Sequence, residues 1–431
     1  MRLTLRKFKV NHVDFAEKTE FRNGILYINR EELQALLLED KSFAKIDIEL
    51  VHPGESARIL QVADIIEPRA RLDGGDFPGI LDKTVTIVGN GSTDVLSGSA
   101  VVLVDECGGN CGAMHDGAGN VIDMSGPGAE VSAYGHTHNV CIITHAAGGI
   151  DPTRPEYKIA AKVAAIRASV YLAQACRGLE PDEEKVYALP PLSEVAKGME
   201  DLPRVVYVFN FYRYYFKNEP VIYGKAFSWL PSVLMHPNEF LDGAVVNSYL
   251  NANLSSPASM DTYEIQNHPV IEELYRRHGK DICFLGVIPT VAQVEESAVD
   301  SQTNLAIKLA LTLGANGAVL TKAPGGSPQM DVANFAIKAH ELGMKSVLIL
   351  DDLAARSPDG MYRVNGILYS DERAGAIVNT SNISDLVKLP PVERAIGHPT
   401  PGGDGELVRL RSALMGQSGQ LGNTYWAEVE Y

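Results

Sequence analysis

Cysteine is scarce in this sequence. The 431 residues contain five cysteines, and so small and odd a number argues against a framework of disulfides and favours reduced thiols. Residues 1–15, MRLTLRKFKVNHVDF, alternate apolar and charged side chains as a strand does, and they lack the apolar core and cleavage site of a signal peptide. Together these absences predict a cytoplasmic protein.

Long apolar runs and basic stripes are also missing. The most apolar stretches, such as KVAAIRASVYLAQAC, carry charges and stay below the roughly 18 residues of a bilayer span, so we expect no membrane helix. The formal net charge of −16 repels phosphate backbones, and no stretch rich in Lys and Arg is interleaved with aromatic residues. A nucleic acid is therefore not an expected partner.

The first part of the chain has the pattern of short strands separated by Gly and Pro. The expected strands are residues 25–30, 44–53, 57–72, 83–89, 99–106 and 139–149. A long helix is then predicted from residue 155 to about 183, because Pro155 suits a first helical position and Gly178 and Pro181 suit an end. The first part is therefore predicted to be a β-rich lobe.

The second half alternates strands and helices. Strands are expected at 204–212, 281–289, 317–323 and 345–352, with helices at 267–279, 303–315 and 331–344. Such alternation predicts a mainly parallel sheet covered by helices, and hence an α/β fold. We expect a β-rich lobe over 1–154, a helix and connecting strand over 155–240, a candidate processing stretch over 241–268, and a Rossmann-like lobe over 269–431.

A loop rich in cysteine, histidine and glycine is a candidate metal site. Thiolates and imidazoles are the ligands that zinc prefers, and His-x-His on a strand would point both rings to one face. The spacing matches no standard zinc module, so histidines scattered on loops and a buried Cys141 stay an open alternative. The candidate ligands for zinc or another transition metal are Cys107, Cys111, His115, His136 and His138.

Two glycine-rich turns are candidate substrate sites. The first, KAPGGSPQM, lies between an expected strand and an expected helix, where backbone N–H groups favour an anion such as a carboxylate. The second is the Ser-Gly-Pro-Gly turn of IDMSGPGAE, where a ligand could approach closely. Either turn could simply redirect the chain. The candidate substrate-binding residues are Gly325, Gly326, Ser327, Ser125 and Gly126.

The stretch VVNSYLNANLSSPASMDTY, residues 245–263, places an Asn-Ser bond between two apolar blocks. A serine side chain can attack the preceding carbonyl in a strained turn, and elimination from the resulting ester leaves a pyruvoyl group. That ketone serves as an electron sink for an amine substrate. Asn-Ser pairs are common, so an ordinary loop is the alternative.

Several blocks, in order along the chain, resemble one known family. They are ELVHPGESARI, DIIEPRARL, VIDMSGPGAE, MHPNEFLDGAVV, KSVLILDD and AIGHPTPGG, and the likeness continues to LGNTYW near the C-terminus. The chain resembles the proprotein of the substrate-specific component B of glycine, sarcosine and betaine reductases.

The resemblance implies chemistry at the Asn-Ser stretch. In that family a proprotein is cleaved at an Asn-Cys bond shortly after the segment matching DGAVV, and the Cys becomes a pyruvoyl group. The ketone holds the substrate amine as a Schiff base, and a selenocysteine of a partner subunit and a small selenoprotein displace the C–N bond. This implies an oligomeric complex with a second subunit that carries selenocysteine or cysteine, and reductive cleavage of a small amine or amino acid.

The sequence departs from the family at this point. No cysteine lies between Cys176 and Cys283, so the precursor residue would be a serine. Asn247–Ser248 keeps the order of the family bond but comes slightly early, and Ser255 is a weaker choice. We predict Ser248 as the pyruvoyl precursor and Asn247 as the cleavage partner.

Two other functions stay open. The cysteine-containing loop differs from the shorter family segment before DMSGPGA, so the chain could be an unprocessed metalloenzyme that uses a metal in place of the ketone. It could also be a non-catalytic scaffold that keeps the interface with its partner subunit.

Overall fold

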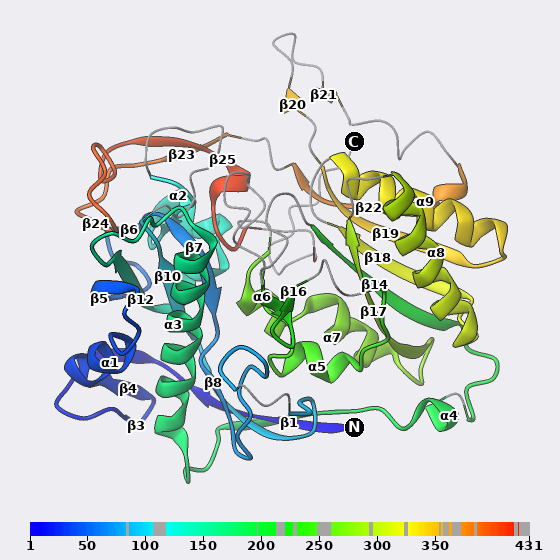
Figure 1. Ribbon diagram of the computed structural model, residues 1–431, viewed down its shortest axis with the longest axis horizontal. Helices are drawn as coiled ribbons and strands as arrows, with labels where there is room; N and C mark the ends of the chain where they lie inside the picture. Colours follow the sequence, from blue (N-terminus) through cyan, green and yellow to red (C-terminus); the bar gives the residue numbers. More distant parts are fainter. Residues whose placement is uncertain are drawn as a thin grey trace.

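The computed structural model describes most of the chain. It covers residues 1–82, 86–106, 118–195, 197–212, 220–226, 231–247, 260–292, 296–322, 326–352, 355–356, 362–363, 372–382, 386–417 and 421. Figure 1 shows a β-rich part that contains α1, α2 and α3 beside a part in which α8 and α9 cover a sheet. The α/β fold, with a β-rich N-terminal region and a parallel sheet further on, is confirmed.

The β-rich part is built from several small sheets, whose strand orders are β13-β1-β9-β8, β5-β12-β10-β7, β11-β6-β24 and β2-β4-β3. Its elements are β1 (Arg2–Lys9), β2 (His12–Phe15), β3 (Glu20–Arg22), β4 (Ile25–Ile28), α1 (Arg30–Leu37), β5 (Phe43–Val51), β6 (Ala57–Ile59), β7 (Val62–Ile66), β8 (Arg69–Arg71), β9 (Gly91–Ser97), β10 (Ser99–Val104), β11 (Ile122–Asp123), α2 (Gly126–Val131), η1 (Ala133–His136), β12 (His138–Ala146), α3 (Pro155–Ala173), η2 (Gln174–Cys176) and β13 (Glu183–Ala188).

Two of the predicted strands are wrong in detail. Residues 57–72 form three strands rather than one, since Gln61 adopts a φ of 50° and turns the chain between β6 and β7. Residues 86–89, the described part of the expected strand 83–89, form no strand.

Helix α3 begins at Pro155, as predicted, but it ends at Ala173 rather than near residue 183, and it packs in the interior. Nearly all its faces carry buried residues, as expected of a helix without a polar side. By length and composition it is the one described helix that could cross a membrane, contrary to the sequence expectation, yet 61% of its most apolar 18-residue stretch is buried inside the protein. Core helices have the same composition, and the burial of α3 is that of a core helix.

The second part contains a five-stranded, all-parallel sheet of order β17-β14-β18-β19-β22. The predicted strand 204–212 has those bounds in the structure. Its elements are α4 (Leu192–Val195), β14 (Arg204–Tyr212), β15 (Pro220–Ile222), β16 (Lys225–Ala226), α5 (Pro237–Leu241), α6 (Thr262–Gln266), α7 (Pro269–Arg277), β17 (Cys283–Ala292), α8 (Glu296–Thr312), β18 (Gly317–Lys322), α9 (Gly326–Glu341), β19 (Lys345–Asp352) and β22 (Ala376–Asn382).

The C-terminal segment returns to the β-rich part. Strand β24 (Arg394–Ile396) pairs in parallel with β6, and β23 (Leu386–Leu389) pairs with β25 (Leu407–Leu410). The remaining elements are β20 (Ala355–Arg356), β21 (Tyr362–Arg363), η6 (Glu372–Ala374) and η7 (Arg411–Ala413). The β-rich part also shares a core with the parallel sheet, because Leu3 and Leu5 of β1 belong to the same apolar cluster as that sheet.

Candidate functional site

The predicted cleavage residue Asn247 is held by a buried cation. Lys162, on the core helix α3, is fully buried, and its ammonium donates a hydrogen bond of 2.6 Å to the backbone carbonyl oxygen of Asn247. A charge-assisted bond to a carbonyl pulls electron density toward the oxygen. The carbonyl that polarises in this way is the one preceding Ser248, which lies outside the described residues.

The backbone N–H of Asn247 is held as well. The Asn247 N–H donates to the Thr262 hydroxyl oxygen at 3.0 Å, and that hydroxyl donates to the Asp64 carboxylate at 2.6 Å. Asp64 also accepts the Thr262 N–H at 3.0 Å. The described residues on the two sides of 248–259 are therefore hydrogen-bonded to each other, inside the protein.

Burial sets the electrostatics of this group of side chains. It raises the pKa of Asp64 to about 6, although the Thr262 hydrogen bonds and the charge of Lys162 oppose the shift. Burial raises the pKa of Asp261 well above its usual range, with the Asp64 charge adding to the effect, while Tyr134 donates to both carboxylate oxygens at 2.6 Å. The site therefore combines a buried ammonium with two carboxyls whose pKa values burial raises.

Local sequence explains why α6 presents these groups. Asp261 caps the helix by accepting the N–H of Glu264, whose side chain returns a bond to the Asp261 N–H. This reciprocal capping box fixes the start of the helix, with Asp261 as the N-cap and Thr262 as the first helical residue. The side chain of Thr262 thereby faces Asp64 of β7.

Two further buried ion pairs fix the surroundings. Arg69 pairs with Glu67 at 2.5 Å and donates to the Leu241 carbonyl, which links β8 to the end of α5. Arg71 pairs with Asp242, which also accepts the N–H of Gly89 at 2.7 Å. The blocks DIIEPRARL and MHPNEFLDGAVV, far apart in sequence, therefore meet in the folded chain.

A second candidate site lies at the end of the parallel sheet. In the order β17-β14-β18-β19-β22, the strand that comes first in the sequence, β14, is second in the sheet. The direction of winding therefore reverses between β14 and β18. Ligands of doubly wound sheets bind outside the carboxyl ends of the strands at such a reversal.

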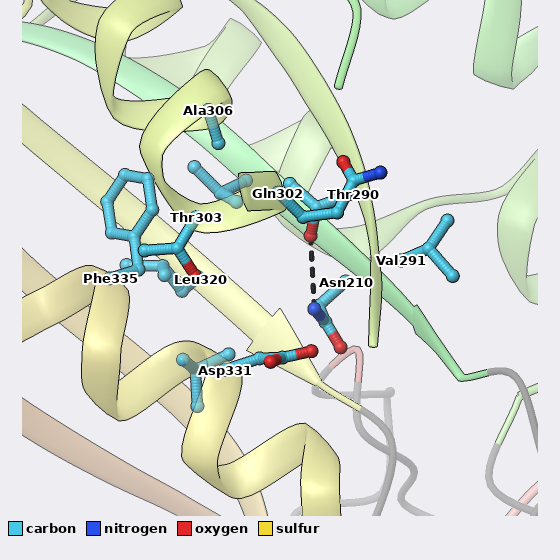
Figure 2. A pocket seen from close by; sticks show the side chains of 11 residues that line it. Asn210, Thr290, Val291, Gln302, Thr303, Ala306, Leu320, Asp331 and Phe335 are labelled. Carbon is cyan, nitrogen blue, oxygen red and sulfur yellow. Dashed lines mark hydrogen bonds between the residues drawn. The ribbon is translucent and has the colours of Figure 1, made fainter. Parts of the chain in front are cut away.

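Side chains at this reversal line a small cavity (Figure 2). Asn210 of β14 donates to the Thr290 hydroxyl of β17 at 3.0 Å, and Asp331 of α9 lines the same space. The carbonyl oxygen of the Asn210 side chain is buried without a partner among the described residues. The cavity measures about 10 Å³, room for one water at most.

The predicted substrate residues fall in two places. Gly326 and Ser327 are the first residues of α9, directly after the β18 end of the sheet, whereas Gly325 lies outside the described residues. Ser125 and Gly126 stand at the start of α2, which Figure 1 places on the other side of the molecule. The structure does not bring the two glycine turns together.

The predicted metal ligands are also dispersed. Cys107, Cys111 and His115 lie outside the described residues. The expectation that His136 and His138 share a strand is wrong: His136 ends the 3-10 turn η1 and is exposed, whereas His138 begins β12. His138 instead contacts His52 at 2.9 Å between their Nδ1 atoms.

Cys141 is fully buried, as the alternative reading expected. Burial raises the pKa of its thiol. It is therefore held as a neutral thiol rather than as a metal-binding thiolate.

Sequence reasoning missed Lys162, Asp64 and Thr262. One signal was present, because KIAAKVAAIR places Lys158 and Lys162 one turn apart on a helix that is otherwise almost wholly apolar. Buried lysines require partners, and Lys158 finds Asp105 at 3.4 Å. The partner of Lys162 could not be read from the sequence, since it lies 85 positions away.

The β-rich part, the doubly wound sheet and the buried polar side chains around Asn247 define an α/β protein with candidate sites at Asn247 and at the strand reversal. Residues 1–405 match the family of glycine/sarcosine/betaine reductase component B subunits. The chain belongs to that family.

Component B subunits of glycine and sarcosine reductases align with nearly the whole chain. The glycine reductase complex component B subunits alpha and beta of Acetoanaerobium sticklandii are 35% identical, over 92% of this chain and 89% of the relative. Those of Peptoclostridium acidaminophilum are 32% identical over 100% of both chains. The sarcosine reductase complex component B subunit alpha of that organism is 34% identical over 92% and 89%. No solved structure matches the chain.

Proposed function

We propose that this component B subunit cuts its own backbone at Asn247–Ser248 and binds a small amine or amino acid for reductive C–N cleavage. The observation that carries the proposal is the 2.6 Å hydrogen bond from the Lys162 ammonium to the Asn247 carbonyl oxygen. Family membership supports the role in a reductase complex. The second subunit in this proposal carries selenocysteine or cysteine, and the complex assembles in the cytoplasm.

The cleavage step follows from the contacts of Asn247. The Ser248 hydroxyl attacks the Asn247 carbonyl carbon, so negative charge develops on the oxygen to which Lys162 donates. The C–N bond breaks as the Ser248 nitrogen takes up a proton, leaving an ester between the two residues. Loss of the Ser248 Cα proton expels the Asn247 carboxylate, and water then replaces the nitrogen, which leaves as ammonia.

The residues around Asn247 fit the formation of a pyruvoyl group, with one difference from the family pattern. A serine hydroxyl is a weaker nucleophile than a cysteine thiolate, so its reaction depends more on a polarised carbonyl. Lys162 supplies that polarisation, and Thr262 holds the N–H of Asn247 so that the carbonyl keeps its direction. When formed, a pyruvoyl group supplies an electron-poor ketone for the substrate amine.

This proposal places the acidic end of an amino-acid substrate at the strand reversal. Helix α9 begins there, and the N-terminus of a helix this long carries a partial positive charge. In this proposal Gly325, Gly326 and Ser327 bind the substrate carboxylate. Ser125 and Gly126 stay a prediction.

A pair of serine variants tests the assignment. Ser248→Ala should yield a single uncut chain, because the attacking oxygen is removed, whereas the matched variant Ser255→Ala should still yield two fragments. The measurement is denaturing electrophoresis of freshly synthesised protein over time. Fragments that persist in Ser248→Ala would reject Ser248 as the precursor, and loss of cleavage in Ser255→Ala alone would move the site there.

A further inference from the structure

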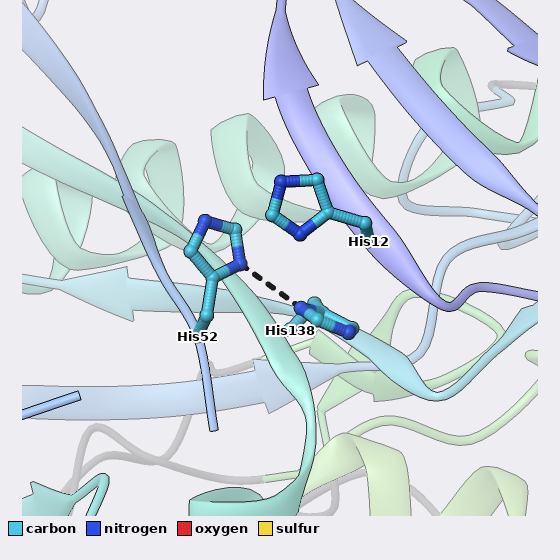
Figure 3. Close-up of side chains that lie close together, drawn as sticks. All are labelled: His12, His52 and His138. Atoms are coloured by element: carbon cyan, nitrogen blue, oxygen red, sulfur yellow. Dashed lines mark hydrogen bonds between the residues drawn. The ribbon is translucent and has the colours of Figure 1, made fainter. Parts of the chain in front are cut away.

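Three histidines from separate strands meet on the β-rich part (Figure 3). They are His12 at the start of β2, His52 just after β5, and His138 at the start of β12. The His52 and His138 Nδ1 atoms are 2.9 Å apart, and the His12 and His52 rings stack with centroids 4.5 Å apart. One ring nitrogen from each of the three lies within 4.8 Å of the others.

The backbone around these rings is fixed. The His138 N–H donates to the Gly98 carbonyl at 3.0 Å, and His12 pairs with Ile25 in the parallel ladder of β2 and β4. The His52 carbonyl accepts the N–H of Glu55 in a turn. The three side chains are therefore presented by rigid elements rather than by free loops.

A hydrogen bond orients one of the rings as metal ligands are usually oriented, and a carboxylate lies near the outer nitrogen of another. His138 also hydrogen-bonds the backbone of Asn11, a contact that favours protonation of the ring and so makes the ring the donor. The His52 Nε2 faces the Glu55 carboxylate at 3.9 Å. Histidines that bind metals typically donate their other N–H to a carbonyl or a carboxylate, which leaves the first nitrogen for the metal.

The protonation of the rings agrees with this arrangement. Burial lowers the pKa of His52 and of His138 below the ordinary range of histidine, and the neighbouring imidazoles lower that of His138 further. Neutral imidazole is the form that binds metals. Glu55 and Asp14 oppose the shift at His52, whereas His12 and Arg394 add to it.

We propose that His12, His52 and His138 form a binding site for a late first-row divalent metal such as zinc. Three imidazoles with a fourth position open to water or a ligand are a common zinc arrangement, with Zn–N distances of about 2.0–2.1 Å. The ion replaces the proton that lies between the His52 and His138 Nδ1 atoms. That proton moves to the His52 Nε2, which faces Glu55. The site requires none of Cys107, Cys111 and His115.

Zinc titration of the tag-free full-length protein tests the site, after treatment with a chelator and in competition with a chromophoric zinc indicator. Wild type should bind one equivalent that His12→Ala, His52→Ala and His138→Ala each lose, with at least a tenfold weaker affinity. Glu55→Gln should weaken binding by roughly tenfold, because the negative charge that faces the His52 Nε2 is lost. His136→Ala, which removes an exposed histidine two positions from His138, should leave binding unchanged.

Two further measurements keep the outcome unambiguous. X-ray absorption at the zinc edge should show nitrogen and oxygen ligands only, and a sulfur ligand would assign the ion to cysteines and overturn the proposal. Melting temperatures without metal separate lost binding from lost folding, and exposed His12 offers the mildest substitution. Wild-type binding no tighter than that of His12→Ala, or binding abolished by His145→Ala in the separate cluster with Glu106 and His398, would also overturn it.

Discussion

Lys162 keeps its ammonium group inside the protein, a position that costs several kcal/mol unless the charge is compensated. Its hydrogen bond to the Asn247 carbonyl and the charge of Asp64 provide compensation. Lys158 occupies the preceding turn of α3, pairs with Asp105 and is buried to a similar degree. The two lysines therefore differ in partner more than in environment.

That difference gives a sharp prediction. Lys162→Met should slow the formation of fragments by about 100-fold to 1000-fold, the loss expected when one oxyanion donor is removed. Lys158→Met, also a buried lysine replaced by an apolar residue, should leave the cleavage rate within a few-fold of wild type. The measurement is the rate of cleavage after synthesis, with melting temperatures to verify folding. Equal slowing in both variants would mean that helix packing, rather than the contact with Asn247, is responsible.

Asp64 predicts a pH dependence of stability. Its folded pKa of about 6 lies above the roughly 3.9 of an unfolded aspartate, so the native state binds more protons between these values. The contribution of Asp64 to stability is therefore present below about pH 4 and is lost as the pH rises through about 6.

Asp64→Asn removes this titration. The free energy of unfolding of the variant, relative to wild type, should rise by up to about 3 kcal/mol between pH 4 and pH 7. Denaturant unfolding at several pH values measures the difference, and exposed Asp201→Asn serves as the control. A difference between Asp64→Asn and wild type that is the same at every pH contradicts the account.

At the scale of elements, Arg58 of β6 joins the C-terminal segment to the β-rich part. It is fully buried and forms a two-point ion pair with Asp123 of β11, with bonds of 2.6 and 3.0 Å. It also donates to the backbone carbonyls of Pro390, Gly403 and Gly405. One side chain thus fixes β6, β11 and the segments that flank β24.

Arg58→Met should lower the free energy of unfolding by about 3–5 kcal/mol, since Asp123 would remain buried without its counter-charge. The surface pair of Arg373 and Glu341, 3.0 Å apart, gives a matched control. Arg373→Ala should change stability by no more than about 1 kcal/mol, because exposed pairs contribute little. Denaturant unfolding measures both, and similar losses would argue that Arg58 does not hold the segments together.

Elements with a regular period were predictable, and contacts that depend on the tertiary fold were not. The strand at 204–212 and the start of α3 at Pro155 follow from apolar spacing and the geometry of proline. The strand expected at 57–72 fails at Gln61, whose positive φ no apolar pattern reveals.

The candidate site shows the same division. Asn247 was predicted from the chemistry of the Asn-Ser bond and the family resemblance. Lys162, Thr262 and Asp64 were missed, because α3, α6 and β7 meet only in the folded chain. The metal prediction named His138 but not His12 or His52, which come from other strands and show no motif spacing.

The predicted cut divides elements that are interleaved in space. Strand β14 belongs to residues 1–247, yet it lies between β17 and β18, which belong to 248–431. In the other direction, β24 from the second segment pairs with β6 from the first. Two fragments produced at Asn247–Ser248 would therefore share both their sheets and their core.

Cleaved protein should for this reason behave as one particle. Size-exclusion chromatography in native buffer should elute both fragments together, and separation should require denaturant concentrations that also unfold the protein. Circular dichroism across the same concentrations provides the comparison. Fragments that separate while the secondary structure persists would contradict the interleaved sheet.

The intact mass of purified protein under denaturing conditions tests the central claim most directly. The account predicts two species that divide between Asn247 and Ser248, the smaller of which lacks a free amino terminus and is lighter than its sequence by the mass of one ammonia. A single species at the full 46.6 kDa would contradict it, and would mean that the chain holds Asn247 in place without cutting there.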